Sequence, residues 1–186
     1  KAFFANLYRE HPYAAPREGD EPGLRAITRD DLVAYHARYF TGRNAVLAIM
    51  GDLTRREAEA LAQRVAGGLP PGAPAPALPA VSDVAPTTKA EQFIAHPSAQ
   101  SHILIGEAGV RRNDPDYFPL FVGNYVLGGG GFVSRLTKAI RDERGLSYSV
   151  YSDFIPMRER GPFVIGLQTR NDQRELALRV AREVLA

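Results

Sequence analysis

The stretch that decides the fold is GGGGFVSRLTKAIRDERGLSYSV, which occupies residues 128–150. Its apolar side chains recur at helical spacing and predict a helix over about 133–144. They are Val133, Leu136 and Ile140. Gly145 suits the left-handed residue that ends such a helix. Since a strand is predicted over 146–154, this stretch predicts a helix that turns directly into a strand.

The chain upstream of this stretch predicts two strands and a helix. The strands occupy 92–96 and 102–106. The helix begins at Pro115 with Asp114 as its cap, and it ends at Gly128. We expect its apolar side chains to point inward: Phe118, Phe121, Val122 and Tyr125.

Downstream, a strand over 163–169 is followed by a helix from about Gln173. One face of that helix carries Leu176, Val180 and Val184. From residue 90 to the end, the order is strand, strand, helix, helix, strand, strand, helix, which predicts an α+β fold. We expect a two-layer sandwich with a largely antiparallel sheet and helices on one face.

The first part of the chain predicts a helix, a strand and a second helix. An acidic variant of the capping box at 28–31 opens a helix that runs to about Phe40. The apolar run 45–50 predicts a strand buried within a sheet. A full capping box at 54–57 opens the second helix, and Gly67 ends it.

A segment rich in Pro, Ala and Gly divides the chain. Residues 67–89 form the predicted linker, because proline removes backbone donors and favours extended chain. The first domain is therefore predicted to end with residue 66 and the second to occupy 90–186. Because the strands expected upstream of Lys1 lie outside this sequence, we expect some apolar surface of the first part to be exposed or covered by a neighbouring chain.

Composition excludes several classes of protein. The 186 residues are 45% hydrophobic and 24% charged, which is typical of a globular protein. The 23 Lys and Arg nearly balance the 21 Asp and Glu and are spread along the chain, so we expect no nucleic-acid partner. No cysteine is present to form a disulfide, a thiolate metal site or a nucleophile. The apolar run at the start is too short for a transmembrane segment, and the chain reads as an internal piece of a longer protein.

The histidines do not form a zinc motif. They are His11, His36, His96 and His102. No two of them have the i, i+4 spacing that places two ligands on one helix face, and there is no His-x-x-Glu-His. We therefore expect no metal site and no cofactor within this chain.

The four glycines Gly128, Gly129, Gly130 and Gly131 permit backbone conformations that other residues avoid. A run of this kind indicates a tight loop or a place where another backbone approaches closely. A flexible connection between helices is the plainer alternative. A phosphate-binding loop is a third, although the run follows a helix and lacks the Gly-Lys-Ser/Thr of a P-loop.

Arg141 and Tyr148 lie on adjacent predicted elements, on either side of Gly145. Alternation along the strand places Tyr148 on the face of Leu146, Val150 and Phe154. Arginine offers a fork of donors and tyrosine a hydroxyl on a rigid ring, and together these groups suit a peptide carbonyl and the oxyanion that forms when it is attacked. The structural alternative is a solvated arginine and a core tyrosine.

Residues 128–150 resemble the second-domain signature of the pitrilysin/insulinase family of zinc metallopeptidases, which includes bacterial members related to mitochondrial processing peptidase. Upstream matches extend the resemblance over nearly the whole chain: His11-Pro12-Tyr13, residues 27–32, Tyr39-Phe40, Asn44-Ala45-Val46 and Gly51-Asp52. The resemblance implies two α/β halves that close like a clam shell around an unfolded peptide.

In that family one half supplies zinc through an inverted His-x-x-Glu-His helix and a downstream glutamate. The opposing half supplies an arginine and a tyrosine seven residues apart, which bind the carbonyl of the scissile peptide. Arg141 and Tyr148 have that separation, so the resemblance assigns these roles to them. It also associates Gly128 to Gly131 with substrate handling. The inverted zinc motif itself is absent from this sequence, and the resemblance implies zinc only for the complete protein or for a partner subunit.

Two functions follow from the resemblance. The first is the substrate-binding, non-metal portion of a zinc-dependent endopeptidase, with a peptide substrate and a zinc-bearing half as partners. The second is a non-catalytic partner or scaffold that pairs with a zinc-bearing subunit in a homo- or hetero-oligomer. A nucleotide-binding module built on the glycine run is the remaining class. Resemblance to exported bacterial members favours the periplasm or cell envelope. We expect Arg141 and Tyr148 to share an open cleft with the glycine run at its rim.

Overall fold

The computed structural model describes residues 1–81 and 91–186, and the predicted linker lies outside this part from residue 82 to residue 89. The described residues form two compact units. The larger unit joins Lys1–Ala15 to Leu78–Ala186, and the smaller unit is Pro16–Ala77. The first fifteen residues therefore pack with the C-terminal part of the chain. None of the helices in the described part is long and apolar enough to cross a membrane.

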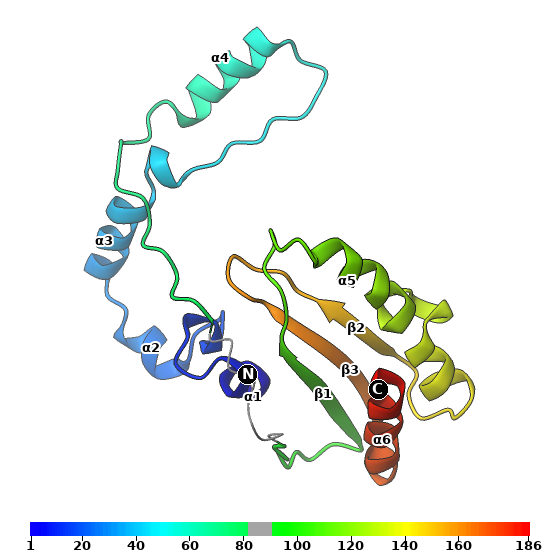
Figure 1. Cartoon of the computed structure of the whole chain (residues 1–186). Coiled ribbons are helices and arrows are strands. Elements are labelled where there is room, and N and C mark those ends of the chain that lie inside the picture. Colours follow the sequence, from blue (N-terminus) through cyan, green and yellow to red (C-terminus); the bar gives the residue numbers. More distant parts are fainter. Residues whose placement is uncertain (82–90) are drawn as a thin grey trace. The chain divides into compact units, whose positions relative to one another are not determined.

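The larger unit is built on a three-stranded antiparallel sheet with the order β1-β3-β2 (Figure 1). The strands are β1 (Gln100–Ala108), β2 (Val150–Phe154) and β3 (Pro162–Arg170). Leu167 of the central strand lies opposite Ile103 on one side and Val150 on the other. β3 has neighbours on both edges and is mostly buried, which accounts for its nearly continuous apolar sequence. The predicted α+β fold with an antiparallel sheet is confirmed.

Helical segments surround this sheet. They are α1 (Ala2–Tyr8), α5 (Tyr117–Asn124), α6 (Arg174–Leu185), two π-helical turns at Tyr125–Gly129 and Thr137–Asp142, and 3-10 turns that include Gly131–Val133. α5 contacts β2, and α6 contacts β1, β3 and the second π-helical turn. α1 contacts β1, where the absence of a side chain at Gly106 makes room for the ring of Phe3.

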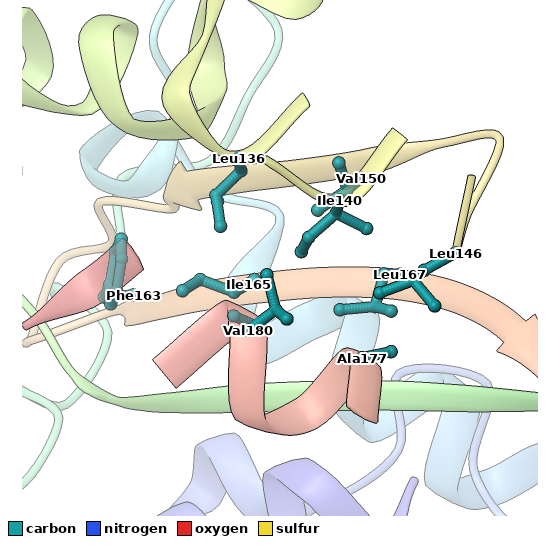
Figure 2. Close-up of a cluster of buried hydrophobic side chains, with 10 residues drawn as sticks. Leu136, Ile140, Leu146, Val150, Phe163, Ile165, Leu167, Ala177 and Val180 are labelled. Atoms are coloured by element: carbon teal, nitrogen blue, oxygen red, sulfur yellow. The ribbon is translucent and has the colours of Figure 1, made fainter. Parts of the chain in front are cut away.

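The hydrophobic core lies between β3, α6 and the π-helical turn at Thr137–Asp142 (Figure 2). Leu136, Ile140 and Ile165 have no exposed surface. Ala177 and Val180 of α6 close the core from the other side. The helical spacing of Leu136 and Ile140 was therefore a correct guide to the buried face of this segment.

The predicted inward face of the helix before the glycine run is wrong. Phe118, Phe121, Val122 and Tyr125 are all exposed, and the buried residues of this segment are Asn124 and Gly128. The reason is the close approach of the backbone at Gly128 to β2, which turns a polar and small face inward. The helix also begins later than predicted. Asp114 accepts from the backbone N–H of Asp116 in a preceding turn, so α5 starts at Tyr117.

Helical periodicity also wrongly predicted that two further side chains are buried. Val133 lies in an exposed 3-10 turn before the helical segment, and Leu176 is on the exposed side of α6. The buried residues of α6 are Ala177, Val180 and Ala181. Small alanines pack against the sheet where the sequence pattern favoured leucine, because they let the helix approach β3 closely.

Two predicted strands are absent from the described residues, and a third is shorter than predicted. Residues 92–96 and 45–50 have no strand pairing, and β2 begins only at Val150. A strand requires partners for its backbone N–H and C=O groups, and no described strand lies beside the run 45–50. Val46 and Met50 are accordingly 97% and 95% exposed. The expected exposure of apolar surface in the first part of the chain is confirmed.

The smaller unit is held by local interactions. Its helices are α2 (Glu21–Ala26), α3 (Arg29–Tyr39) and α4 (Arg55–Ala66). Both predicted capping boxes are present, with Thr28 and Asp31 at α3 and Thr54 and Glu57 at α4. The side chain of Asn44 donates to the carbonyl of Ala73 and accepts from the N–H of Ala75, which ties the turn after α3 to the later chain.

Candidate functional site

Arg141 lies in the second π-helical turn, Thr137–Asp142, next to the fully buried Ile140. The chain reverses directly after it. The N–H of Gly145 donates to the carbonyl of Arg141 over 2.9 Å, and the N–H of Leu146 donates to that of Ile140 over 2.9 Å. Gly145 has a φ of 59°, so the predicted left-handed end of this helix is confirmed. π-helical turns are frequent at functional sites, and this one sets the position of Arg141.

Tyr148 lies in the short segment between Gly145 and β2, and it is 85% exposed. The prediction that it shares a strand face with Leu146 and Val150 is wrong, because both of those side chains are buried while Tyr148 is not. Two hydrogen bonds hold the segment. Thr169 Oγ1 donates to the carbonyl of Leu146 over 2.6 Å, and Ser147 Oγ donates to the carbonyl of Ser149 over 2.7 Å. The tyrosine ring is thus presented to solvent from a segment fixed on either side.

Arg141 and Tyr148 meet at the surface. The guanidinium carbon Cζ of Arg141 lies 5.0 Å from the centre of the Tyr148 ring and 4.6 Å from the centre of the Phe132 ring. These distances are those of cation–π contacts. Sequence reasoning paired Arg141 with Tyr148 but missed Phe132. The available signal was an aromatic residue directly after the glycine run.

The N–H donors of the Arg141 guanidinium are unused among the described residues. Within residues 1–81 and 91–186 it has no ion pair and no hydrogen bond to an acceptor, whereas the nearby Arg144 has both: Arg144 Nη1 donates to Glu143 Oε2 over 2.7 Å and to the carbonyl of Ala139 over 2.9 Å. Guanidinium N–H groups lie in the plane of the group, and stacked rings contact only its faces. Arg141 therefore retains a planar edge of donors suited to a carbonyl or carboxylate oxygen.

The glycine run is an ordered helix end in this structure. A side chain at Gly128 would lie 2.4 Å from Ser152 Oγ and 2.5 Å from the backbone nitrogen of Ser152. This is the close backbone approach that the sequence indicated. The N–H of Gly130 donates to the carbonyl of Tyr125 over 2.9 Å, and Gly131 has a φ of 60°. The run thus ends one helical segment and reverses the chain into the turn that carries Phe132.

Two polar residues that the sequence did not single out hold this arrangement. Asn124 Nδ2 donates to the carbonyl of Ser152 over 3.0 Å, and Ser152 Oγ donates to Asn124 Oδ1 over 2.6 Å. Ser134 Oγ donates to the carbonyl of Gly131 over 2.8 Å and lies 3.0 Å from Thr137 Oγ1. Buried polar groups need such partners, so each pair fixes a distance between two elements. The first joins α5 to β2, and the second joins the turn of Phe132 to the turn of Arg141.

Partial burial changes the pKa of one carboxylate on β2, that of Asp153. The pKa of Asp153 is raised above its ordinary value, chiefly because partial burial disfavours the charged form, while a hydrogen bond from the backbone of Phe154 opposes this. Asp153 is not part of a metal site. Among residues 1–81 and 91–186, no three His, Cys, Asp or Glu side chains converge to hold an ion. The described residues of this chain therefore do not fit a zinc ion.

The surface of the larger unit has a shallow hollow of about 150 Å³ on the sheet. It is lined by His102, Ile103, Leu104, Ser149, Tyr151, Gly166, Leu167 and Gln168. Neither Arg141 nor Tyr148 lines it, although Ser149 is the residue directly after Tyr148. The expected common cleft of Arg141 and Tyr148 stays a prediction.

The fold of this chain is matched by known proteins of one class, the M16 peptidases. The model of the peptidase M16 inactive domain matches residues 26–186. The crystal structure of a peptidase M16 inactive domain from Pseudomonas fluorescens is 40% identical with a TM-score of 0.93, and the match covers 99% of this chain and 44% of that one. An uncharacterized zinc protease of Mycobacterium leprae is 31% identical over 155 residues, which are 81% of this chain and 34% of that protein.

The chain therefore belongs to the peptidase M16 inactive-domain family. A second uncharacterized zinc protease, from Mycobacterium tuberculosis, is 28% identical over 188 residues and matches 98% of this chain. The chain spans 42% of that protein, which is well under half of its length. The predicted membership of a zinc metallopeptidase family is confirmed.

Proposed function

We propose that this chain is the substrate-binding, non-metal portion of a zinc-dependent endopeptidase, in which Arg141 and Tyr148 hold the carbonyl of the scissile peptide bond. The observation that carries the proposal is the partly exposed guanidinium of Arg141, which lies over the ring of Tyr148 and has no acceptor among the described residues. An arginine held against two aromatic rings with unused donors is suited to a peptide oxygen. The names of the relatives support zinc chemistry in the complete protein.

The contribution of this chain is electrostatic. The in-plane N–H groups of Arg141 donate to the carbonyl oxygen of the bound peptide, and the hydroxyl of Tyr148 donates to the same oxygen. When that carbonyl is attacked, negative charge develops on its oxygen, and both donors bind the charged form more strongly than the neutral one. Because the described residues form no metal site, the part of this chain is limited to binding, orienting and stabilising the peptide.

The glycine run contributes to substrate handling in this proposal. Gly128 to Gly131 place the turn at Gly131–Val133 beside Arg141, and the exposed backbone of Gly129 and Gly131 is accessible to an extended peptide. The zinc-bearing half, in another part of the complete protein or in a partner subunit, closes over this surface. That arrangement forms the clam-shell chamber of the complete protein.

Peptide binding by the chain itself tests the proposal. A fluorescein-labelled peptide, acetylated and amidated so that it has no terminal carboxylate, is titrated with the chain and followed by fluorescence polarisation. We expect Arg141→Ala to weaken binding, because it removes the unused donors. Arg144→Ala is the matched control, since that arginine is already occupied by Glu143 and Ala139. Equal affinities in the wild type and Arg141→Ala, or equal losses in both variants, refute the assignment.

A further inference from the structure

Phe132 is a large apolar residue with 74% of its surface exposed, at the end of the glycine run. Its ring is closer to the Arg141 guanidinium than the ring of Tyr148 is, at 4.6 Å against 5.0 Å. Two aromatic rings, from two separate segments of the chain, therefore contact Arg141. This position contributes no buried surface to the core, so packing does not explain an aromatic residue here.

The turn that carries Phe132 is tied to the turn that carries Arg141. The N–H of Ser134 donates to the carbonyl of Gly131 over 3.1 Å, and Ser134 Oγ donates to the same carbonyl. The fully buried Ser134 also contacts Thr137 Oγ1 and accepts from the N–H of Thr137 over 3.3 Å. The hydrogen bonds of Ser134 fix the separation of the two turns. They therefore hold the Phe132 ring in contact with the Arg141 guanidinium.

We propose that Phe132 is a positioning residue: it stacks on Arg141 and holds the guanidinium plane so that the N–H edge faces the peptide carbonyl. This inference rests on the proposed function. An arginine side chain without fixed contacts samples many rotamers, and fixing them before binding removes an entropic cost from the complex. Aromatic rings suit this purpose, because they contact the faces of the guanidinium and leave its donors unused.

The first measurement detects the stacking without reference to peptide binding. The ¹⁵Nε–¹Hε resonance of Arg141 is recorded in the wild-type chain and in variants, since a nearby ring shifts it. We expect Phe132→Ala and Phe132→Leu to move this resonance toward the position of a solvated arginine, and Phe132→Tyr to leave it in place. Phe118→Ala is the matched control, because Phe118 is 73% exposed and has no cation–π contact with Arg141.

The second measurement is the affinity for the blocked peptide. We expect Phe132→Ala and Phe132→Leu to weaken binding by about two- to five-fold, the equivalent of one exposed cation–π contact. Phe132→Tyr and Phe118→Ala should bind as the wild type does. In a chain that already has Arg141→Ala, the further change Phe132→Ala should have no effect. Circular dichroism spectra check that each variant is folded.

The outcomes separate the two proposals. If Arg141→Ala weakens binding and Phe132→Ala does not, the positioning role is overturned and the role of Arg141 stands. If the Phe132 variants move the Arg141 resonance while Arg141→Ala leaves affinity unchanged, the function proposed for Arg141 fails and the positioning role fails with it. An equal loss in Phe132→Tyr and Phe132→Ala also overturns the inference, because a tyrosine ring preserves the stacking.

Discussion

The guanidinium of Arg141 lies over the ring of Tyr148, with its Cζ atom 5.0 Å from the ring centre. The two residues are on opposite sides of the left-handed Gly145, which reverses the chain between them. The ring and the hydroxyl of Tyr148 have different roles in this contact. Its ring contacts the Arg141 guanidinium, and its hydroxyl belongs to a side chain that is largely exposed. Substitutions can remove one property and keep the other.

Replacing Tyr148 by Phe removes the hydroxyl and preserves the ring. In the complete peptidase we expect turnover to fall by about 10²-fold or more, the usual cost of losing one donor to a developing oxyanion. The peptide affinity of the chain should fall much less than turnover, because the hydroxyl binds the neutral carbonyl more weakly than the oxyanion and Arg141 keeps its contact with the ring. Tyr148→Ala should lower both turnover and affinity. The measurements are kcat and KM for the complete protein and the dissociation constant of the blocked peptide for the chain.

The double variant Arg141→Ala/Tyr148→Phe examines whether both groups act on one carbonyl. If they do, its loss of turnover should be smaller than the product of the two single losses. Multiplicative losses would indicate two independent sites. Full activity in both single variants would return Arg141 and Tyr148 to a structural role.

Replacing Gly128 by Ala should destabilise the larger unit by about 1–3 kcal/mol, the usual cost of overpacking. The new Cβ would lie 2.5 Å from the backbone nitrogen of Ser152, which belongs to β2 and has little freedom to move. Gly123→Ala, in the preceding helix α5, is the control, because no described atom outside the backbone of its own helix lies within 4 Å of its Cβ position. We expect it to stabilise the chain by about 0.5–1 kcal/mol. Urea unfolding measures both, and equal midpoints would show that Gly128 is not sterically required.

The sequence predicted the fold well where a local signal and the tertiary contact agree. The capping boxes at Thr28 and Thr54, the left-handed Gly145 and the buried pair Leu136 and Ile140 all satisfy this condition. Each depends on residues within one turn or one helix face. Such signals do not require knowledge of what lies across the core.

The sequence failed where the deciding contact comes from a distant segment. The buried face of α5 is set by Ser152, which is 28 positions away from Asn124, and helical periodicity alone favoured the aromatic face. The strand predicted at 45–50 needs neighbouring strands, and the described chain has none beside it. Phe132 was missed because a cation–π contact at a surface has no periodic pattern. The seven-residue spacing and the family resemblance indicated Arg141 and Tyr148, and only the structure placed a second ring, that of Phe132, beside Arg141.

The stability of the larger unit should depend on pH in the alkaline range through Tyr8. Burial, with a smaller effect of Tyr13, raises the pKa of Tyr8 from 10.0 to about 12, while Arg160 lowers it slightly. A raised pKa in the folded state means that the stabilising contribution is complete below pH 10 and is lost as the pH rises toward 12.

The variant Tyr8→Phe cannot ionise, so its unfolding midpoint in urea should fall less steeply than that of the wild type between pH 10 and pH 12. Tyr8→Phe also loses the hydrogen bond from the Tyr8 hydroxyl to the carbonyl of Arg160, so its free energy of unfolding at neutral pH should be lower than that of the wild type. Tyr35→Phe is the control, because Tyr35 is exposed in the smaller unit. Parallel curves for the wild type and Tyr8→Phe would contradict the prediction.

The chain alone should bind no stoichiometric zinc and hydrolyse no peptide. Zinc sites in proteins use three or four His, Cys, Asp or Glu ligands, and no three such side chains converge in residues 1–81 and 91–186. Dialysis against buffered zinc, then against metal-free buffer, followed by elemental analysis gives the metal content, and a quenched fluorogenic peptide reports hydrolysis. The complete protein treated in the same way is the comparison. One zinc ion retained per chain would show that ligands outside the predicted motif assemble here, and the assignment of this chain to the non-metal portion would be wrong.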